Sequence, residues 1–177
     1  MLRRLILVVA LLAPSAGMAQ PYAGLNDRSV KSLSDQQTAD LKAGRGMGLA
    51  LAAELNGYPG PMHVLEHANA LALSPEQRTR TQELIAEMKA EAVPIGERLI
   101  QQEAELDRLF AGGEINPAIL QTKTGQIGAT QARLRETHLK YHLAMVEILS
   151  PAQISRYQEL RGYTAAGGKQ MHRHNPH

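Results

Sequence analysis

One short motif, Leu-Ser-x-x-Gln, occurs three times in the chain, beginning at Leu33, Leu73 and Leu149. Serine is a preferred N-cap residue because its hydroxyl accepts a hydrogen bond from a free backbone N–H of the first helical turn. Glutamine at the third helical position can bond back to the N–H of the cap, which completes a capping box. The motif therefore predicts three helix starts, whose capping residues are Ser34, Gln37, Ser74, Gln77, Ser150 and Gln153.

The second and third copies bracket two long helical patterns, from residue 75 to about 110 and from 117 to about 148. The break between them, Gly112 to Pro117, is rich in residues that end helices, so the two patterns predict an antiparallel helical hairpin. Pro94 is expected to kink or divide the first arm. Shorter helices are expected at 33–56, 62–71 and 151–162, and no strand pattern is present. The sequence predicts an all-α fold built on this long hairpin.

The two ends of the chain have a different composition from its middle. Arg3 and Arg4 precede an apolar run and then small residues at Gly17 and Ala19, the pattern of a cleavable export signal over residues 1–19. Retention of this segment as an anchor is the alternative. We expect an irregular arm at 20–32, a helical domain at 33–163 and a disordered tail at 164–177. The expected location is the periplasm, with no membrane span after cleavage.

Composition excludes several classes of function. The chain has no Cys, which excludes thiolate metal sites, thiol catalysis and disulfides. Loss of residues 1–19 removes two arginines and lowers the formal charge from +2 to zero, and no Lys/Arg cluster remains for nucleic acid. The string His63-x-x-Glu-His67 fits an inverted zinc-protease motif, but no further ligand motif follows it. Without a nucleophile–base pair or paired acids near a pocket, no enzymatic activity is predicted.

The seven histidines fall into three groups, and two of these are pairs spaced four residues apart. Such pairs project from one helix face and can supply two imidazoles to one ion. If the hairpin turns near residue 114, residues that face each other have numbers summing to roughly 228. The histidine pair of the second arm then lies level with two glutamates of the first arm. The predicted metal ligands are His63, His67, Glu83, Glu87, His138 and His142.

Several alternatives remain open for these residues. His138 lies on the apolar stripe of its helix and would also suit a buried neutral histidine, and the pair at 63 and 67 would suit plain surface. Which glutamate would bind the metal is undecided. The tail adds a second, looser set of possible ligands, namely Met171, His172, His174 and His177. Imidazole and carboxylate suit Zn(II), Cu(II), Ni(II) or Co(II), and nearby methionine would favour copper.

The paired motif that flanks a long hairpin resembles the LTxxQ superfamily of periplasmic proteins, with Ser in place of the commoner Thr. That superfamily includes stress proteins of the Spy and CpxP type and heavy-metal sensors of the CnrX type. The histidine pairs at 63/67 and 138/142, with a glutamate between them, resemble the sensor pattern, although His142 stands where Met is common. The resemblance implies a periplasmic homodimer that senses a metal and signals to an envelope partner, or an ATP-independent chaperone that binds unfolded clients.

Overall fold

The structure is a computed structural model that describes Tyr22 and residues 24–163. Within this part of the chain every regular element is helical: η1 (Leu25–Asp27), α1 (Asp35–Lys42), α2 (Leu51–Glu54), α3 (Pro61–Glu66), α4 (Pro75–Ala111), α5 (Pro117–Ile148) and α6 (Pro151–Leu160). The predicted all-α fold is confirmed. The expected export signal and the expected tail lie outside the described residues. No helix of the described residues is long and apolar enough to cross a membrane.

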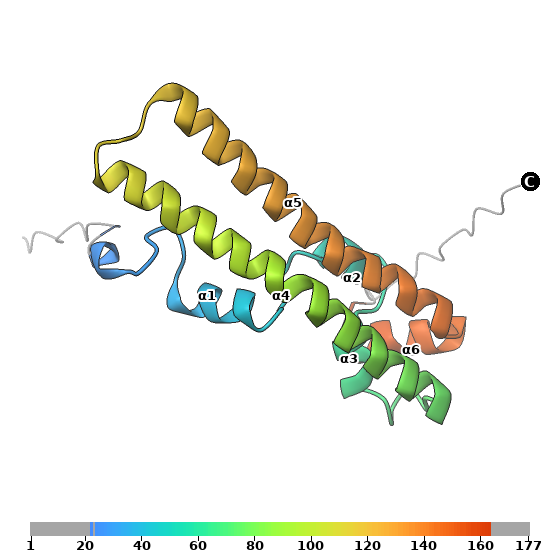
Figure 1. Cartoon of the computed structure of the whole chain (residues 1–177). Coiled ribbons are helices and arrows are strands. Elements are labelled where there is room, and N and C mark those ends of the chain that lie inside the picture. The colour runs from blue at the N-terminus through green and yellow to red at the C-terminus, as the bar shows by residue number, and fades with distance from the viewer. Residues whose placement is uncertain (1–21, 23, 164–177) are drawn as a thin grey trace, which may run out of the picture.

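Helices α4 and α5 form the predicted hairpin, and the shorter helices gather along it (Figure 1). Lys123 of α5 pairs with Glu105 of α4 at 2.7 Å, and these two numbers sum to the value expected from the turn position. Nearer the open end, the hydroxyl of Tyr141 donates to Glu91 at 2.8 Å, which lies one helical turn from the residue that the same sum places opposite it. The position of the turn therefore gives the register near the turn, because both arms rise equally per residue, and gives it only to within about one turn at the open end.

Helix α4 is not divided at Pro94 but continues as one helix. Residues on both sides of the proline are buried, Ala92 and Gly96, where α1 lies across α4. A side chain at Gly96 would place its Cβ 2.6 Å from the carbonyl oxygen of Leu41. This close backbone contact packs α4 against α1 next to the proline, and α4 continues through it without the hydrogen bond that proline removes.

The segment before the hairpin differs from the single helix expected at 33–56. It consists of α1 and α2, joined by turns in which Gly44, Met47 and Gly48 have φ values of 65°, 44° and 81°. These left-handed conformations end a right-handed helix. Helix α3 is also shorter than expected and ends at Glu66, after which turns lead to Ala72 at φ 47°. These breaks let the chain fold back on itself beside the hairpin.

The hydrophobic core forms two clusters. One lies beneath α1 and contains Leu41, Ala92, Leu99, Ile127 and Leu134. The other lies at the open end of the hairpin, where α3 and α6 pack on it, and contains Val64, Ala68, Leu71, Leu73, Leu84, Met88, Tyr141, Met145, Leu149 and Tyr157. Tyr157 holds α6 in this second cluster, with only 1% of its surface exposed.

All three Leu-Ser-x-x-Gln motifs form complete capping boxes, as predicted. The second and third copies also bond to each other. The amide of Gln77 donates to Gln153 at 2.9 Å, and the amide of Gln153 donates back at 3.0 Å. The same two amides donate to the carbonyls of Ile148 and Leu71. This Gln77–Gln153 bridge joins the starts of α4 and α6 and fixes the loops before both helices.

We expect replacement of Gln153 by Ala to destabilise the protein by about 2–3 kcal/mol, because it removes the bridge together with one half of a capping box. Gln37→Ala is the matched control, since Gln37 occupies the same motif position but bonds only within its own box. It should cost about 1 kcal/mol or less. Urea unfolding followed by circular dichroism measures both. Equal losses would show that the bridge adds nothing.

Candidate functional site

A cavity of about 210 Å³ lies where α2, α3, α5 and the end of α6 meet, close to α4. We call it the histidine cavity, because three imidazoles line it. Its wall consists of Gly46, Met47, Gly48, Ala50, Leu51, Glu54, Gly60, Pro61, Met62, His63, Met88, His138, His142, Arg161 and Tyr163. Nitrogen, oxygen and thioether donors thus come to one place from segments that are far apart in the sequence.

His138 is buried on the inner face of α5, with 3% of its surface exposed. Its Nε2 atom finds no hydrogen-bond partner among the described residues. A buried polar atom without a partner costs free energy, so one in a well-packed helical protein calls for an explanation. Burial, and the nearby His142, lower the pKa of His138 below its ordinary value of 6.5. The ring is therefore neutral at pH 7, the form in which imidazole binds a metal.

His142 lies one turn further along α5 and is also buried. Its Nδ1 lies 2.7 Å from the backbone carbonyl of Tyr58, which can only accept a hydrogen bond. Nδ1 therefore carries the proton in the neutral ring, and the lone pair is on Nε2. A Cβ at Gly60 would lie 3.2 Å from this Nε2 and 2.9 Å from the adjacent ring carbon. The backbone of Gly60 thus packs closely against this edge of the imidazole, where a side chain would clash.

A buried carboxylate, Glu54, forms a third part of the cavity wall. One oxygen accepts hydrogen bonds from the hydroxyls of Tyr157 and Tyr163, the latter at 3.2 Å, and the other accepts from the N–H of Gly60 at 3.1 Å. Arg161 lies 3.5 Å away. Burial, followed by the hydrogen bond to Glu54, raises the pKa of Tyr157 well above its usual value, so this phenol stays protonated and donates. We call Glu54, Tyr157, Arg161 and Tyr163 the Glu54 cluster.

The structure brings three of the six predicted ligands together, His63, His138 and His142. His63 is partly exposed, and its Nδ1 lies 2.9 Å from Glu66. His67 does not line the cavity; its ring meets that of Tyr157 edge to face at 6.4 Å.

Glu83 and Glu87 lie on the exposed face of α4 and both pair with Arg80, at 2.9 Å and 3.0 Å. Neither lines the histidine cavity. The tail ligands, Met171, His172, His174 and His177, lie outside the described residues. The binding of a metal by the predicted ligands stays a prediction.

Sequence reasoning missed Glu54. The only signal was weak: Glu54 is the single charged residue between Arg45 and Glu66, in a stretch otherwise rich in Ala, Leu and Gly. A lone charge in an apolar segment is costly to bury unless it finds partners, and these come from a helix about a hundred residues later.

The donors do not converge on one point. Within residues 24–163 no group of three or more His, Asp or Glu side chains is arranged to hold a metal ion as it stands. The oxygens of Glu54 are occupied by hydrogen bonds, and His63 is paired with Glu66. A bound ion would therefore require small movements of side chains around the two histidines of α5.

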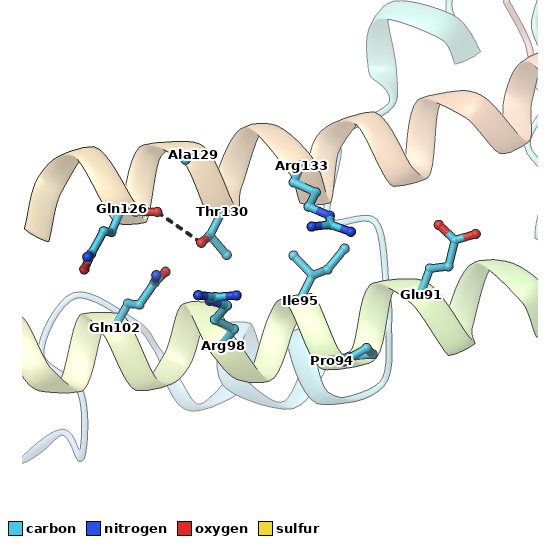
Figure 2. A pocket seen from close by; sticks show the side chains of 9 residues that line it. All are labelled: Glu91, Pro94, Ile95, Arg98, Gln102, Gln126, Ala129, Thr130 and Arg133. Carbon is cyan, nitrogen blue, oxygen red and sulfur yellow. Dashed lines mark hydrogen bonds between the residues drawn. The ribbon is translucent and has the colours of Figure 1, made fainter.

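A second, larger cavity of about 530 Å³ lies between the arms of the hairpin. Figure 2 shows Arg98 of α4 and Arg133 of α5 extending toward one another, close to Ile95. Among the described residues, the ion pairs nearest to this cavity are made by Lys123 and Lys140, and neither Arg98 nor Arg133 forms one. Glu91, also in the wall, is engaged by Lys140 and Tyr141, and these hydrogen bonds lower its pKa. This hairpin cavity therefore combines positive charge with apolar surface.

The model of one protein family, described as heavy-metal resistance, matches residues 5–156 of the chain. This range contains the hairpin, the histidine cavity except for Arg161 and Tyr163, and most of α6. No curated protein and no solved structure matches the chain.

We expect His138→Leu to stabilise the metal-free protein by about 1 kcal/mol at pH 7, because it removes a buried nitrogen that has no partner. The variant should also lose part of its sensitivity to acid. The pKa of His138 is lower in the folded than in the unfolded chain, so the unfolded state binds more protons as the pH falls below 6.5. That loss of stability disappears when the imidazole is removed.

Urea unfolding between pH 5 and 8 measures both effects. His142→Leu is the matched control and should destabilise the protein, since it leaves the carbonyl of Tyr58 without its donor. If His138→Leu lowered stability at pH 7 as much as the control does, His138 would have an undetected partner.

Proposed function

We propose a metal-binding function for this chain, which belongs to the heavy-metal resistance family. Membership of that family indicates a role related to heavy-metal resistance. The finer proposal is that a divalent transition metal binds in the histidine cavity through the Nε2 atoms of His138 and His142. The observation that carries it is the buried Nε2 of His138, which has no partner among the described residues and belongs to a side chain that lines a cavity together with His142.

The hydrogen bond from His142 to Tyr58 supports this assignment. Histidines that bind metals generally donate their other ring N–H to a carbonyl or carboxylate, which fixes the tautomer and the direction of the free lone pair. His142 has this arrangement before any metal is bound. Burial keeps the pKa of His138 below its ordinary value, so this imidazole would not first have to lose a proton to bind a metal.

The further donors are His63, on the rim of the cavity, and the thioethers of Met62 and Met88 in its wall. Imidazole ligands suit Zn(II), Cu(II), Ni(II) and Co(II), and thioethers favour copper among these. Engagement of His63 would tie α3 to α5. We propose that this rearrangement changes the exposed surface near the open end of the hairpin for a signalling partner, in a homodimer located in the periplasm.

The test uses the full chain with His172, His174 and His177 replaced by Gln, so that the tail cannot bind metal. Calorimetric titration with each of the four metals should show one strong site per chain for at least one of them. The double variant His138→Ala/His142→Ala should lose this binding, with affinity lowered at least about a hundredfold, because two inner ligands are gone.

His67→Ala and Glu83→Gln/Glu87→Gln are the matched controls, because these side chains lie outside the cavity. Circular dichroism confirms that each variant folds. Binding that survives the loss of both α5 histidines would refute the proposal. Loss of binding in the glutamate variant alone would move the site to the outer face of α4.

A chaperone activity is the second candidate, and the hairpin cavity favours it. Two arginines beside apolar side chains can hold segments of unfolded protein that mix acidic and apolar residues. This activity would not need a metal.

We expect metal-free protein, in several-fold excess, to suppress the heat-induced aggregation of citrate synthase measured by light scattering. Arg98→Ala/Arg133→Ala should weaken the suppression, because it removes the positive charge of the cavity. Arg156→Ala is the control, since this arginine pairs only with Glu159 on α6. No suppression by the unmodified chain would exclude this activity.

A further inference from the structure

We propose that Glu54 completes the metal site, and that metal binding draws it away from Tyr157, Tyr163 and Arg161 and loosens residues 161–163, which follow α6. This inference rests on the proposed function and adds a ligand and a conformational response to it. It concerns a residue that the histidine pattern of the sequence does not include.

The geometry places the carboxylate beside the imidazole of His142. One oxygen of Glu54 lies 3.7 Å from Nδ1 of His142. A Cβ at Gly60 would lie 3.3 Å from that same oxygen and 3.2 Å from Nε2 of His142. Both atoms therefore lie against the backbone of Gly60, and both residues line the histidine cavity. A metal needs distances of about 2.0–2.2 Å to its ligands, so both side chains have to move before they can bind one ion.

The inward movement competes with the present partners of the carboxylate. The oxygen that faces Gly60 also accepts the backbone N–H of that residue, and the other oxygen accepts from Tyr157 and Tyr163. A cation that binds the carboxylate withdraws negative charge from it, which weakens both phenol hydrogen bonds. Glu54 thus has two alternative sets of partners, the metal or the tyrosines.

Electrostatic repulsion between the metal and Arg161 would favour the same release. Arg161 lines the cavity and lies 3.5 Å from Glu54, which is its only ion-pair partner among the described residues. A divalent ion in the cavity would repel this guanidinium and at the same time neutralise the carboxylate that attracts it. Arg161 also donates to the hydroxyl of Tyr163, at 3.0 Å. Arg161 and Tyr163 would therefore detach from Glu54 together.

The released part is short and has a clear boundary. Upstream of it, α6 stays attached through the Gln77–Gln153 bridge and the buried ring of Tyr157. The backbone N–H groups of residues 161–163 bond to carbonyls of α6, and Glu54 holds the side chains of Arg161 and Tyr163. Metal binding would in this way loosen residues 161–163 without unfolding the helical domain.

Cleavage by trypsin measures how far residues 161–163 are released. Trypsin cleaves after arginine, and two such sites lie close together, the exposed Arg156 within α6 and Arg161 of the cluster directly after it. The ratio of cleavage at Arg161 to cleavage at Arg156 cancels any direct effect of the metal on the protease. The experiment uses the full chain with the three tail histidines replaced by Gln. The probe is the chloride of whichever metal of the four binds most tightly.

We expect saturating metal to raise this cleavage ratio several-fold in the chain whose histidine cavity and Glu54 cluster are unchanged. The ratio should stay the same in His138→Ala/His142→Ala. Glu54→Gln should weaken metal binding about tenfold or more, because a neutral amide is a poorer ligand than a carboxylate. Tyr163→Phe should strengthen it about three- to tenfold, since it removes one competitor for Glu54. If Tyr163 only stabilised the fold, its replacement by Phe would not tighten metal binding.

The outcomes separate the two proposals. Stoichiometric binding with an unchanged cleavage ratio, and with no gain of affinity in Tyr163→Phe, overturns the role of Glu54 and leaves the metal site in place. Absence of binding in the chain with an intact cavity overturns the metal site itself. Glu54→Asp, which keeps the charge on a shorter side chain, should retain more affinity than Glu54→Gln. The reverse order would also overturn the assignment of Glu54 as a ligand.

Discussion

The structure depends on how the open end of the hairpin is closed. Two long helices joined by a short turn remain side by side only if their far ends are also fixed. The Gln77–Gln153 bridge does this with reciprocal amide hydrogen bonds, and each amide also binds a carbonyl of a neighbouring loop. Because the bridge fixes the starts of both α4 and α6, it also sets where Tyr157 enters the core. The histidine cavity lies directly beside this closed end.

The cavity itself carries a cost in stability. A helical protein gains most by filling such a space with Leu or Ile, yet here three imidazoles, a carboxylate and an arginine line it. Most of these groups are satisfied by hydrogen bonds, and the exception is Nε2 of His138. The flanking backbone packs closely against these groups, since a Cβ at Gly60 would lie 2.9 Å from a ring carbon of His142. Such a concentration of polar groups in a small core is more consistent with a binding site than with packing alone.

The sequence predicted helix α5, which carries His138 and His142, but it did not predict the buried carboxylate of Glu54. His138 and His142 lie on a long, regular helix, where spacing alone determines which face each residue occupies. The same reasoning placed Glu83 and Glu87 level with these histidines on the first arm. A difference of one position in a helix turns a side chain by about 100°, and both glutamates point outward toward Arg80. Glu54 lies in the irregular segment, where no periodicity exists to predict its direction.

Local chemistry in the sequence determined the helix starts, the antiparallel hairpin and its register near the turn, because capping, helical rise and the position of one turn require no distant partner. Tertiary structure alone decided that α1 and α2 are separate, that Pro94 is accommodated within α4, and that Glu54 meets Tyr157, Tyr163 and Arg161. These features depend on contacts between segments up to 109 residues apart. Their free energies come from burial and from paired polar groups, which no local pattern in the chain records.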